Sequence, residues 1–242
     1  HSTAMKRFVL LFFALAGFIS SAAGQEQEIT GFVYVSETPT PVPFASVWLC
    51  DPATGEPEYG TITAMNGWYD FGNVATDQTY QLKISGPGIR TRSKEIEIKY
   101  VPGRIGNIDY YIPVERSADT VAFRPVETYR PKQIAPDART IEDLYSHIPG
   151  ITYEDGYLTN ENGATVCLMF SGIIPDEAGY AAILTNLTAD NIERIEYYRL
   201  DNLEEPYYDG VLNFVTVGVN FNAPSIKAVS YTHLRAHETL RH

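Results

Sequence analysis

The sequence predicts a mainly β protein with two folded parts, an N-terminal antiparallel β-sandwich and a small α+β domain. Short runs of β-branched and aromatic residues, separated by turn residues and without helical periodicity, recur over residues 29–114. A segment with three prolines, 116–139, follows, and proline at that density keeps a chain extended and outside a sheet interior. Beyond it, helix-start signals alternate with apolar β runs, as in an α+β domain.

The sandwich is expected to span residues 25–115, with seven short strands that follow one another as an antiparallel meander. The Asn66-Gly67 dipeptide predicts a tight hairpin between two of them, because both residues tolerate positive φ angles. A second turn is expected at 51–55, where Pro52 and Gly55 occupy favourable turn positions. The predicted strands are 29–35, 44–50, 60–63, 68–71, 80–84, 95–98 and 108–112.

The second domain is expected to span residues 140–222 and to open with a helix. Thr140 and Asp143 have the spacing of a capping box, and Ile141, Leu144 and Ile148 form a short apolar stripe that ends at Pro149-Gly150. A second short helix is predicted over 187–192, with Thr188 as its N-cap. Strands are predicted over 165–170, 195–200 and 211–217.

The beginning of the chain has the three parts of a secretory signal peptide. Lys6 and Arg7 form the positive end, residues 8–19 an apolar run, and residues 22–24 a small-residue cleavage site before Gln25. The alternative is a membrane anchor, but twelve apolar residues are fewer than the roughly 20 that a spanning helix needs. Residues 1–4 are interpreted as upstream read-through or as a remnant of an expression vector. The sequence therefore predicts export.

The acidic charge and the two cysteines exclude several functions. Loss of Lys6 and Arg7 would lower the net charge from −12 to −14, which argues against nucleic acid and anionic lipid as partners. Cys50 and Cys167 lie in apolar stretches of different domains, so buried unpaired thiols are favoured over a disulfide. No CxxC motif is present, and no cofactor is expected.

Few residues suggest catalysis, so an enzyme is not expected. His147 lies at the end of a predicted helix and is interpreted as a surface residue; hydrolase activity abolished by His147→Ala would revive the catalytic alternative. The pairs Glu204-Glu205 and Glu154-Asp155 lack the spacing of a metal-binding loop and are interpreted as solvated loops.

Three segments of the sandwich carry a family resemblance: Gly31-x-Val33, residues 43–49 and residues 60–71. Together they resemble the carboxypeptidase regulatory-like domain, although Ala64 stands where that family usually has Asp. The resemblance implies a transthyretin-like sandwich without peptidase activity. Such domains commonly precede the plug domain in TonB-dependent outer-membrane receptors of the Bacteroidetes type.

The second domain resembles such a plug. Residues 141–151 are similar to the opening of the family, 188–198 match its "Asp-Ile-Glu-Arg-Ile-Glu" segment, and 208–216 its final strand, whereas Phe170-Ser-Gly and Asp209 depart from the family pattern. The resemblance implies that Arg194 and Glu196 face the wall of a surrounding barrel. The motif residues are Asp190, Ile192, Glu193, Arg194, Ile195, Glu196, Gly210, Asn213 and Thr216.

Residues 119–123 within the connecting segment resemble a TonB box, which binds a TonB-type energising protein by adding a strand to that protein's sheet. The residues of this segment are Asp119, Thr120, Val121, Ala122 and Phe123.

The resemblances predict the N-terminal fragment of an outer-membrane nutrient receptor, whose plug gates uptake of a small molecule or oligosaccharide through a barrel absent from this chain. Residues 230–242 resemble translated adapter sequence, so the tail, 223–242, is set aside; a natural disordered tail is the alternative. The alternative function is a free-standing periplasmic or surface module that binds glycans or proteins through Trp68, Tyr207 or Tyr208.

Overall fold

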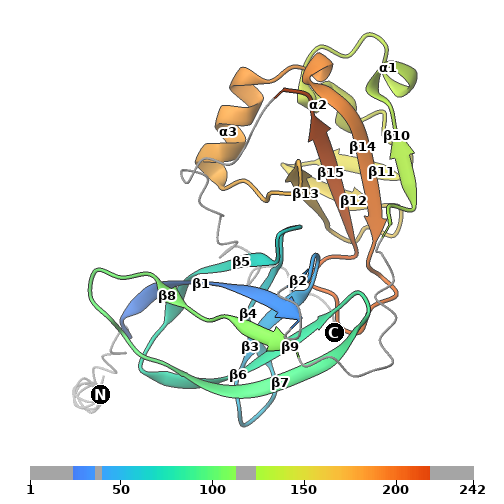
Figure 1. Ribbon diagram of the computed structural model, residues 1–242. Coiled ribbons are helices and arrows are strands. Elements are labelled where there is room, and N and C mark those ends of the chain that lie inside the picture. Colours follow the sequence, from blue (N-terminus) through green and yellow to red (C-terminus); the bar gives the residue numbers. More distant parts are fainter. Residues whose placement is uncertain (1–23, 36–39, 113–123, 219–242) are drawn as a thin grey trace, which may run out of the picture.

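The computed structural model describes residues 24–35, 40–112 and 124–218, which form two domains (Figure 1). The architecture is mainly β, with a sandwich followed by a small α+β domain, which confirms the predicted fold class. The predicted signal peptide, the TonB-box-like segment and the C-terminal tail lie outside the described residues. Among the described residues, no helix is long and apolar enough to span a bilayer.

The N-terminal domain is built from two sheets packed face to face (Figure 1). The first contains β2 (Thr40–Pro41), β1 (Glu26–Val35) and β5 (Trp68–Ala75), with β8 (Gly106–Asn107) and β9 (Tyr110–Ile112) pairing with β1. The second has the order β4 (Pro57–Ile62), β3 (Ser46–Cys50), β6 (Gln78–Gly86) and β7 (Ile89–Ile98).

The core of the sandwich lies between these sheets and follows from the alternation along each strand. On β1, Ile29 and Val33 are buried, whereas Thr30 and Phe32 between them are half-buried on the opposite face. The remaining core side chains come from both sheets and include Val47, Leu49, Tyr69, Phe71, Tyr80, Leu82 and Ile84.

The predicted meander and the predicted hairpin at Asn66-Gly67 are wrong. The turn itself forms, with Gly67 at φ 80° and its N–H donating to the carbonyl of Ala64 over 2.9 Å. However, β4 pairs with β3, and β5 pairs with β1. The turn therefore joins the two sheets instead of two neighbouring strands.

The first sheet is not purely antiparallel, contrary to the prediction. Both β8 and β9 run parallel to β1, with Val33 opposite Tyr110 and Tyr34 opposite Tyr111. The chain reaches them from β7 in the second sheet, so it crosses from one sheet to the other at residues 99–105. A parallel pair requires such a crossover, which local sequence signals do not report.

The second domain has a four-stranded sheet with the order β10 (Glu127–Tyr129), β14 (Ile192–Arg199), β15 (Gly210–Thr216) and β13 (Val166–Phe170). A separate hairpin pairs β11 (Ile151–Glu154) with β12 (Tyr157–Asn160). The helices are α1 (Pro131–Ile134), α2 (Ile141–Tyr145), α3 (Glu177–Asn186) and the 3₁₀ turn η1 (Ala189–Asn191).

Part of the segment expected to be an extended linker contributes structure to this domain. Strand β10 pairs antiparallel with β14 at the sheet edge, and α1 begins at Pro131, a favourable residue for a first helical position. Ala135, just after α1, is 4% exposed and belongs to the domain core. The chain therefore joins the second domain before Thr140.

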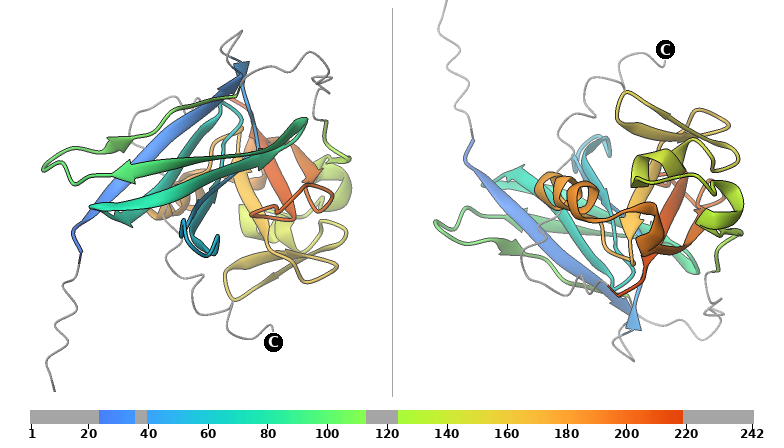
Figure 2. Two further views of the ribbon diagram at one scale, coloured as in Figure 1. Left: turned by 90° about the horizontal axis from the view of Figure 1, so that it is seen from below. Right: turned by 90° about the horizontal axis from the view of Figure 1, so that it is seen from above.

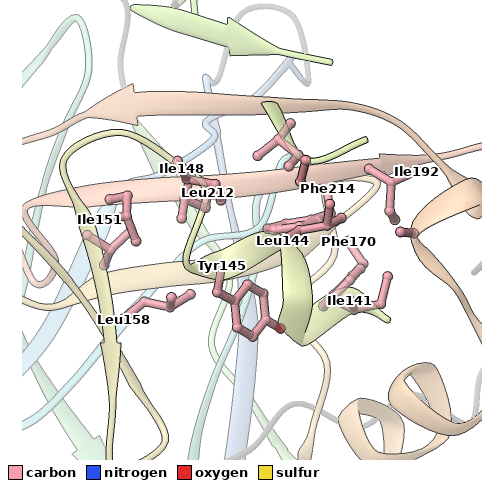
Figure 3. Packing of buried hydrophobic residues seen from close by; sticks show 14 of the residues in the cluster. Ile141, Leu144, Tyr145, Ile148, Ile151, Leu158, Phe170, Ile192, Leu212 and Phe214 are labelled. Atoms are coloured by element: carbon pink, nitrogen blue, oxygen red, sulfur yellow. The ribbon is translucent and has the colours of Figure 1, made fainter. Parts of the chain in front are cut away.

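Both predicted helix starts are confirmed. The hydroxyl of Thr140 accepts from the Asp143 N–H, and the Asp143 carboxylate accepts from the Thr140 N–H, which completes the capping box. Thr188 begins η1, where Asn191 makes the reciprocal contact. The stripe of Ile141, Leu144 and Ile148 is buried against Phe214 and Leu212 of β15 (Figure 3).

The two domains meet through a third apolar cluster, which neither domain completes alone. Phe44 and Ile62 come from the sandwich, and they pack with buried side chains of the second domain. In the views of Figures 1 and 2 the second domain lies over one side of the sandwich. The second-domain members are Cys167, Met169, Tyr198, Leu200, Tyr208 and Val211.

Candidate functional site

The two segments with plug-like motifs are adjacent strands at the centre of the four-stranded sheet of the second domain. Strands β14 and β15 pair antiparallel, with Ile195 opposite Phe214 and Glu196 opposite Asn213. Ile195 and Phe214 point into the domain core on one face of the sheet, and Glu196 and Asn213 lie on the other. The motif residues thus form one structural unit.

Glu196 and Asn213 are the centre of a buried polar network. The Glu196 carboxylate accepts from Arg194 Nε at 2.8 Å, from Asn213 Nδ2 at 2.9 Å and from the Tyr198 hydroxyl at 3.0 Å. Asn213 Oδ1 in turn accepts from the Gly172 N–H at 2.8 Å. The network therefore satisfies a carboxylate whose residue is only 9% exposed.

The network also controls the charge of Glu196. Burial alone would raise the pKa of this carboxyl, but the hydrogen bonds from Asn213, Arg194 and Tyr198 outweigh it, so the pKa is lowered from its ordinary value. The hydrogen bond to Glu196, together with the charges of Glu196 and Glu193, raises the pKa of Arg194. Both groups remain charged near neutral pH.

The structure separates the roles that the resemblance implied for Arg194 and Glu196. The Arg194 side chain is 38% exposed and also binds Glu193 at 3.0 Å, so it is open to an outside contact. The Glu196 carboxylate faces inward and is occupied by groups of the same chain. The Glu196 carboxylate is therefore not available to contact a surrounding barrel wall.

The remaining motif residues serve the fold of the same unit. Ile192 is buried in the core, and Thr216 shares a hydrogen bond with Ser171 at 2.9 Å. A Cβ on Gly210 would lie 2.7 Å from the Tyr197 ring, so close approach explains this glycine. Asp190 lies on the surface and forms an exposed ion pair with Lys132 at 3.4 Å.

The loop between β14 and β15, residues 201–209, was expected to be a solvated loop around Glu204-Glu205, but it contacts the sandwich. Glu205 pairs with Lys83, Glu204 accepts from the Thr91 hydroxyl, and the Tyr207 N–H donates to Ser46 Oγ at 2.9 Å. Gly60, in the middle of β4, was the one sequence signal for this contact, because a glycine within a strand often marks a place where another segment approaches closely.

Two of the three aromatic residues suggested for glycan binding are engaged within the chain. Tyr208 is buried at 7% exposure, and Tyr207 packs edge-on against Trp48 with 5.0 Å between ring centroids. Trp68 differs: it is half-buried on β5 and lies opposite Phe32 in the β1–β5 pairing. The rings of Phe32 and Tyr34 stack at 5.4 Å, and those of Tyr34 and Tyr111 at 5.8 Å.

The other candidate residues lie apart from these sites. His147 is exposed beside α2, with Nδ1 at 2.8 Å from the Asp143 carbonyl oxygen. Glu154 and Asp155 are exposed at the tip of the β11–β12 hairpin. Within the described ranges, no three His, Cys, Asp or Glu side chains gather in a group that could hold a metal ion.

Both cysteines are free and buried, as predicted. Burial raises the pKa of the Cys50 thiol and raises that of Cys167 to about 12.

Comparison with known families supports the first of the two resemblances. Residues 28–108 match the model described as carboxypeptidase regulatory-like domain, from β1 to just after β8. No curated protein matches the chain at a significant level. The sandwich at residues 28–108 is a carboxypeptidase regulatory-like domain.

Proposed function

We propose that this chain is the N-terminal part of a TonB-dependent outer-membrane receptor, in which the second domain is a plug that gates nutrient uptake. The partners in this proposal are a β-barrel around the plug, a TonB-type energising protein, and a small-molecule or oligosaccharide ligand.

The pairing of β14 with β15 is the observation that carries the proposal. Two motifs that resemble the end of a plug are separated in sequence, yet Glu196 and Asn213 face each other and bond directly. A chance similarity in two segments would not require them to be neighbours or to share a buried network. The paired strands also form the centre of the sheet.

The sandwich supports the same proposal by its position in the chain. A carboxypeptidase regulatory-like domain precedes the second domain, which is the order in the receptors that the sequence resembles. The sandwich contacts the second domain through the third cluster, the 201–209 loop and Met65. The hairpin β11–β12 carries the exposed residues Tyr153 and Tyr157, which provide surface for a surrounding partner.

Site-specific photo-crosslinking in cells tests the proposal. A photoreactive phenylalanine analogue would replace Tyr157, which is 46% exposed on the second domain, and in a matched variant Tyr111, which is 54% exposed on the sandwich. A plug predicts that position 157 crosslinks to strands of an outer-membrane barrel, whereas position 111 does not. Recovery of both variants in the periplasm without a barrel adduct would contradict the proposal.

A second candidate function is a glycan-binding module, favoured by the aromatic group around Trp68. Phe32, Tyr34 and Tyr111 stack in a row beside it, and aromatic side chains on a sheet face offer apolar surface to sugar rings. Since the chain has two tryptophans, Trp48→Phe leaves Trp68 as the only indole reporter. Saturable quenching of its fluorescence by oligosaccharides, lost in Tyr111→Ala, would favour the module.

A further inference from the structure

The loop of residues 201–209 connects β14 and β15, the two central strands of the sheet in the second domain. Backbone hydrogen bonds join the two ends of the loop. The N–H groups of Leu200 and Asp201 both donate to the carbonyl of Asp209, over 2.8 and 3.1 Å. Leu203 donates to the carbonyl of Leu200 over 2.9 Å. These hydrogen bonds close the loop directly at the ends of β14 and β15.

The loop lies on the outer face of the second sheet of the sandwich. Val47 and Leu49 of β3 point into the sandwich core, so Ser46 and Trp48 point the other way. Despite that outward position Ser46 is 1% exposed, and its hydroxyl accepts from the Tyr207 N–H. The indole N–H of Trp48 donates to the carbonyl of Glu205 over 3.2 Å.

Charged contacts extend the attachment to the next two strands. Lys83 of β6 pairs with the Glu205 carboxylate, and the Thr91 hydroxyl of β7 donates to Glu204. Three neighbouring strands of the sandwich thus each bind the loop. The loop residues that they bind, Glu204, Glu205 and Tyr207, lie close together in the sequence, so the loop has one defined position on these strands.

Gly60 makes room for the aromatic part of this contact. It lies opposite Trp48 in the β3–β4 pairing, and the indole lies across it. A Cβ at this position would lie 2.4 Å from Trp48 Cζ3 and 2.6 Å from Tyr207 Cε2. A glycine inside a strand weakens that strand, and the close approach of Trp48 and Tyr207 explains why a glycine is present here.

Glu205 itself has an uncommon backbone conformation, with φ 50°. Non-glycine residues in this region persist where the surroundings determine their conformation strongly. The contacts of Glu205 with Trp48 and Lys83 supply those surroundings, and they come from the other domain.

A second attachment holds the second domain at another point. The Met65 N–H donates to the carbonyl of Gly172 over 3.0 Å, and Met65 Sδ lies 3.7 Å from Asn213 Nδ2. Phe44 of the sandwich packs on Tyr198, with 4.8 Å between ring centroids. Two attachments at different points of one sheet oppose rotation of one domain against the other.

We propose that residues 201–209 form a strap that fixes the orientation of the second domain on the sandwich, so that the two domains move as one body. The strap acts together with the Met65 contact, and neither attachment alone holds the orientation. This inference concerns the described chain and does not depend on a receptor function. It assigns the outer face of β3, β6 and β7 to an acidic, aromatic loop of the same chain.

Backbone ¹⁵N relaxation of the full chain tests the strap, because it reports a rotational correlation time for each domain separately. The wild type should give one common value for both domains. Tyr207→Ala and Gly60→Ala should give two different and shorter values, while Tyr157→Ala, an exposed tyrosine on β12, should match the wild type. Hydrogen exchange at the Tyr207 amide should become about tenfold faster in Gly60→Ala, since one hydrogen bond is lost.

Lys83→Ala provides a variant that leaves both cores intact, because this side chain lies on the outer face of β6. Faster exchange of the strap amides in Lys83→Ala, with unchanged exchange in β1 and β5, would support the strap. Two correlation times in the wild type would overturn the inference. A single common value in both Tyr207→Ala and Gly60→Ala would overturn it as well, because the Met65 contact would then suffice.

Discussion

Asn213 donates its side-chain amide to the carboxylate of Glu196 across the pairing of β14 and β15, over 2.9 Å between Nδ2 and Oε2. Both residues are largely buried, and the bond joins the two segments whose sequences resemble a plug. A buried carboxylate is stable only while its donors remain in place.

Glu196→Ala should destabilise the protein by about 2 kcal/mol, because it leaves buried donors of Asn213 and Tyr198 without their acceptor. Chemical denaturation measures the difference. Glu193→Ala is the matched control: this exposed neighbour binds the same Arg194, and its loss should change stability by less than about 0.5 kcal/mol. Equal losses in the two variants would contradict a special role for Glu196.

Stability should fall in acid partly through Glu196. Its pKa in the folded protein is lowered below the ordinary 4.5, so its contribution is fully present above that value and is lost as pH falls through the folded pKa. The free energy of unfolding of the wild type should therefore approach that of Glu196→Gln as the pH falls below 4.5 and through the lowered pKa of the folded state. A difference that stays constant over this range would contradict the depressed pKa.

Gly172→Ala should cost more stability than Gly163→Ala, although both glycines have similar positive φ angles of 83° and 76°. Each substitution has a backbone cost of about 1–2 kcal/mol. A Cβ at Gly172 also meets Met65, with Sδ at 2.7 Å, whereas nothing lies near a Cβ at Gly163. The difference in melting temperature between the two variants measures the effect of the contact with Met65. Equal melting temperatures would show that the Met65 side chain moves aside without a cost in stability.

Thr140→Ala should destabilise the protein by about 1 kcal/mol through loss of the cap of α2. Thr140→Ser should restore most of the stability, since serine keeps the accepting oxygen. Thr185→Ala, an exposed threonine within α3, is the control and should have little effect or stabilise slightly. A loss at Thr185 as large as at Thr140 would argue against capping as the cause.

Both thiols should react with an aromatic disulfide reagent only as fast as the protein opens. Cys50 and Cys167 are buried, and burial raises the pKa of each thiol, which lowers the reactive thiolate fraction. Absorbance in native buffer should show slow release, and denaturant should give two rapid equivalents. Rapid reaction of one equivalent in native buffer would mean that its domain opens independently.

Local signals in the sequence were sufficient for the elements whose partners lie nearby. The capping box at Thr140 and the stripe of Ile141, Leu144 and Ile148 involve residues within two helical turns, and all of them have the expected environment. Helix α3 was not predicted, although Asp176 caps it. Its apolar residues are spread around the helix instead of forming one stripe, and only Ile183 among them is buried. Periodicity cannot indicate a helix of that kind.

Pairings between distant residues could not be derived in the same way. The turn at Gly67 was recognised, but the two strands that flank it, β4 and β5, pair with β3 and β1 and not with each other. Similarly, Glu204 and Glu205 are adjacent acidic residues, and their partners Thr91 and Lys83 lie in another domain. Only Gly60 carried a trace of that contact in the sequence.

The most direct test of the central claim is an experimental density map of the protein purified from the outer membrane of cells that produce it. The proposed function predicts a closed barrel of strands around the sheet of β10, β13, β14 and β15, with the sandwich outside it. Recovery of the protein only from the soluble periplasmic fraction, as the two domains alone and with no barrel around that sheet, would contradict it.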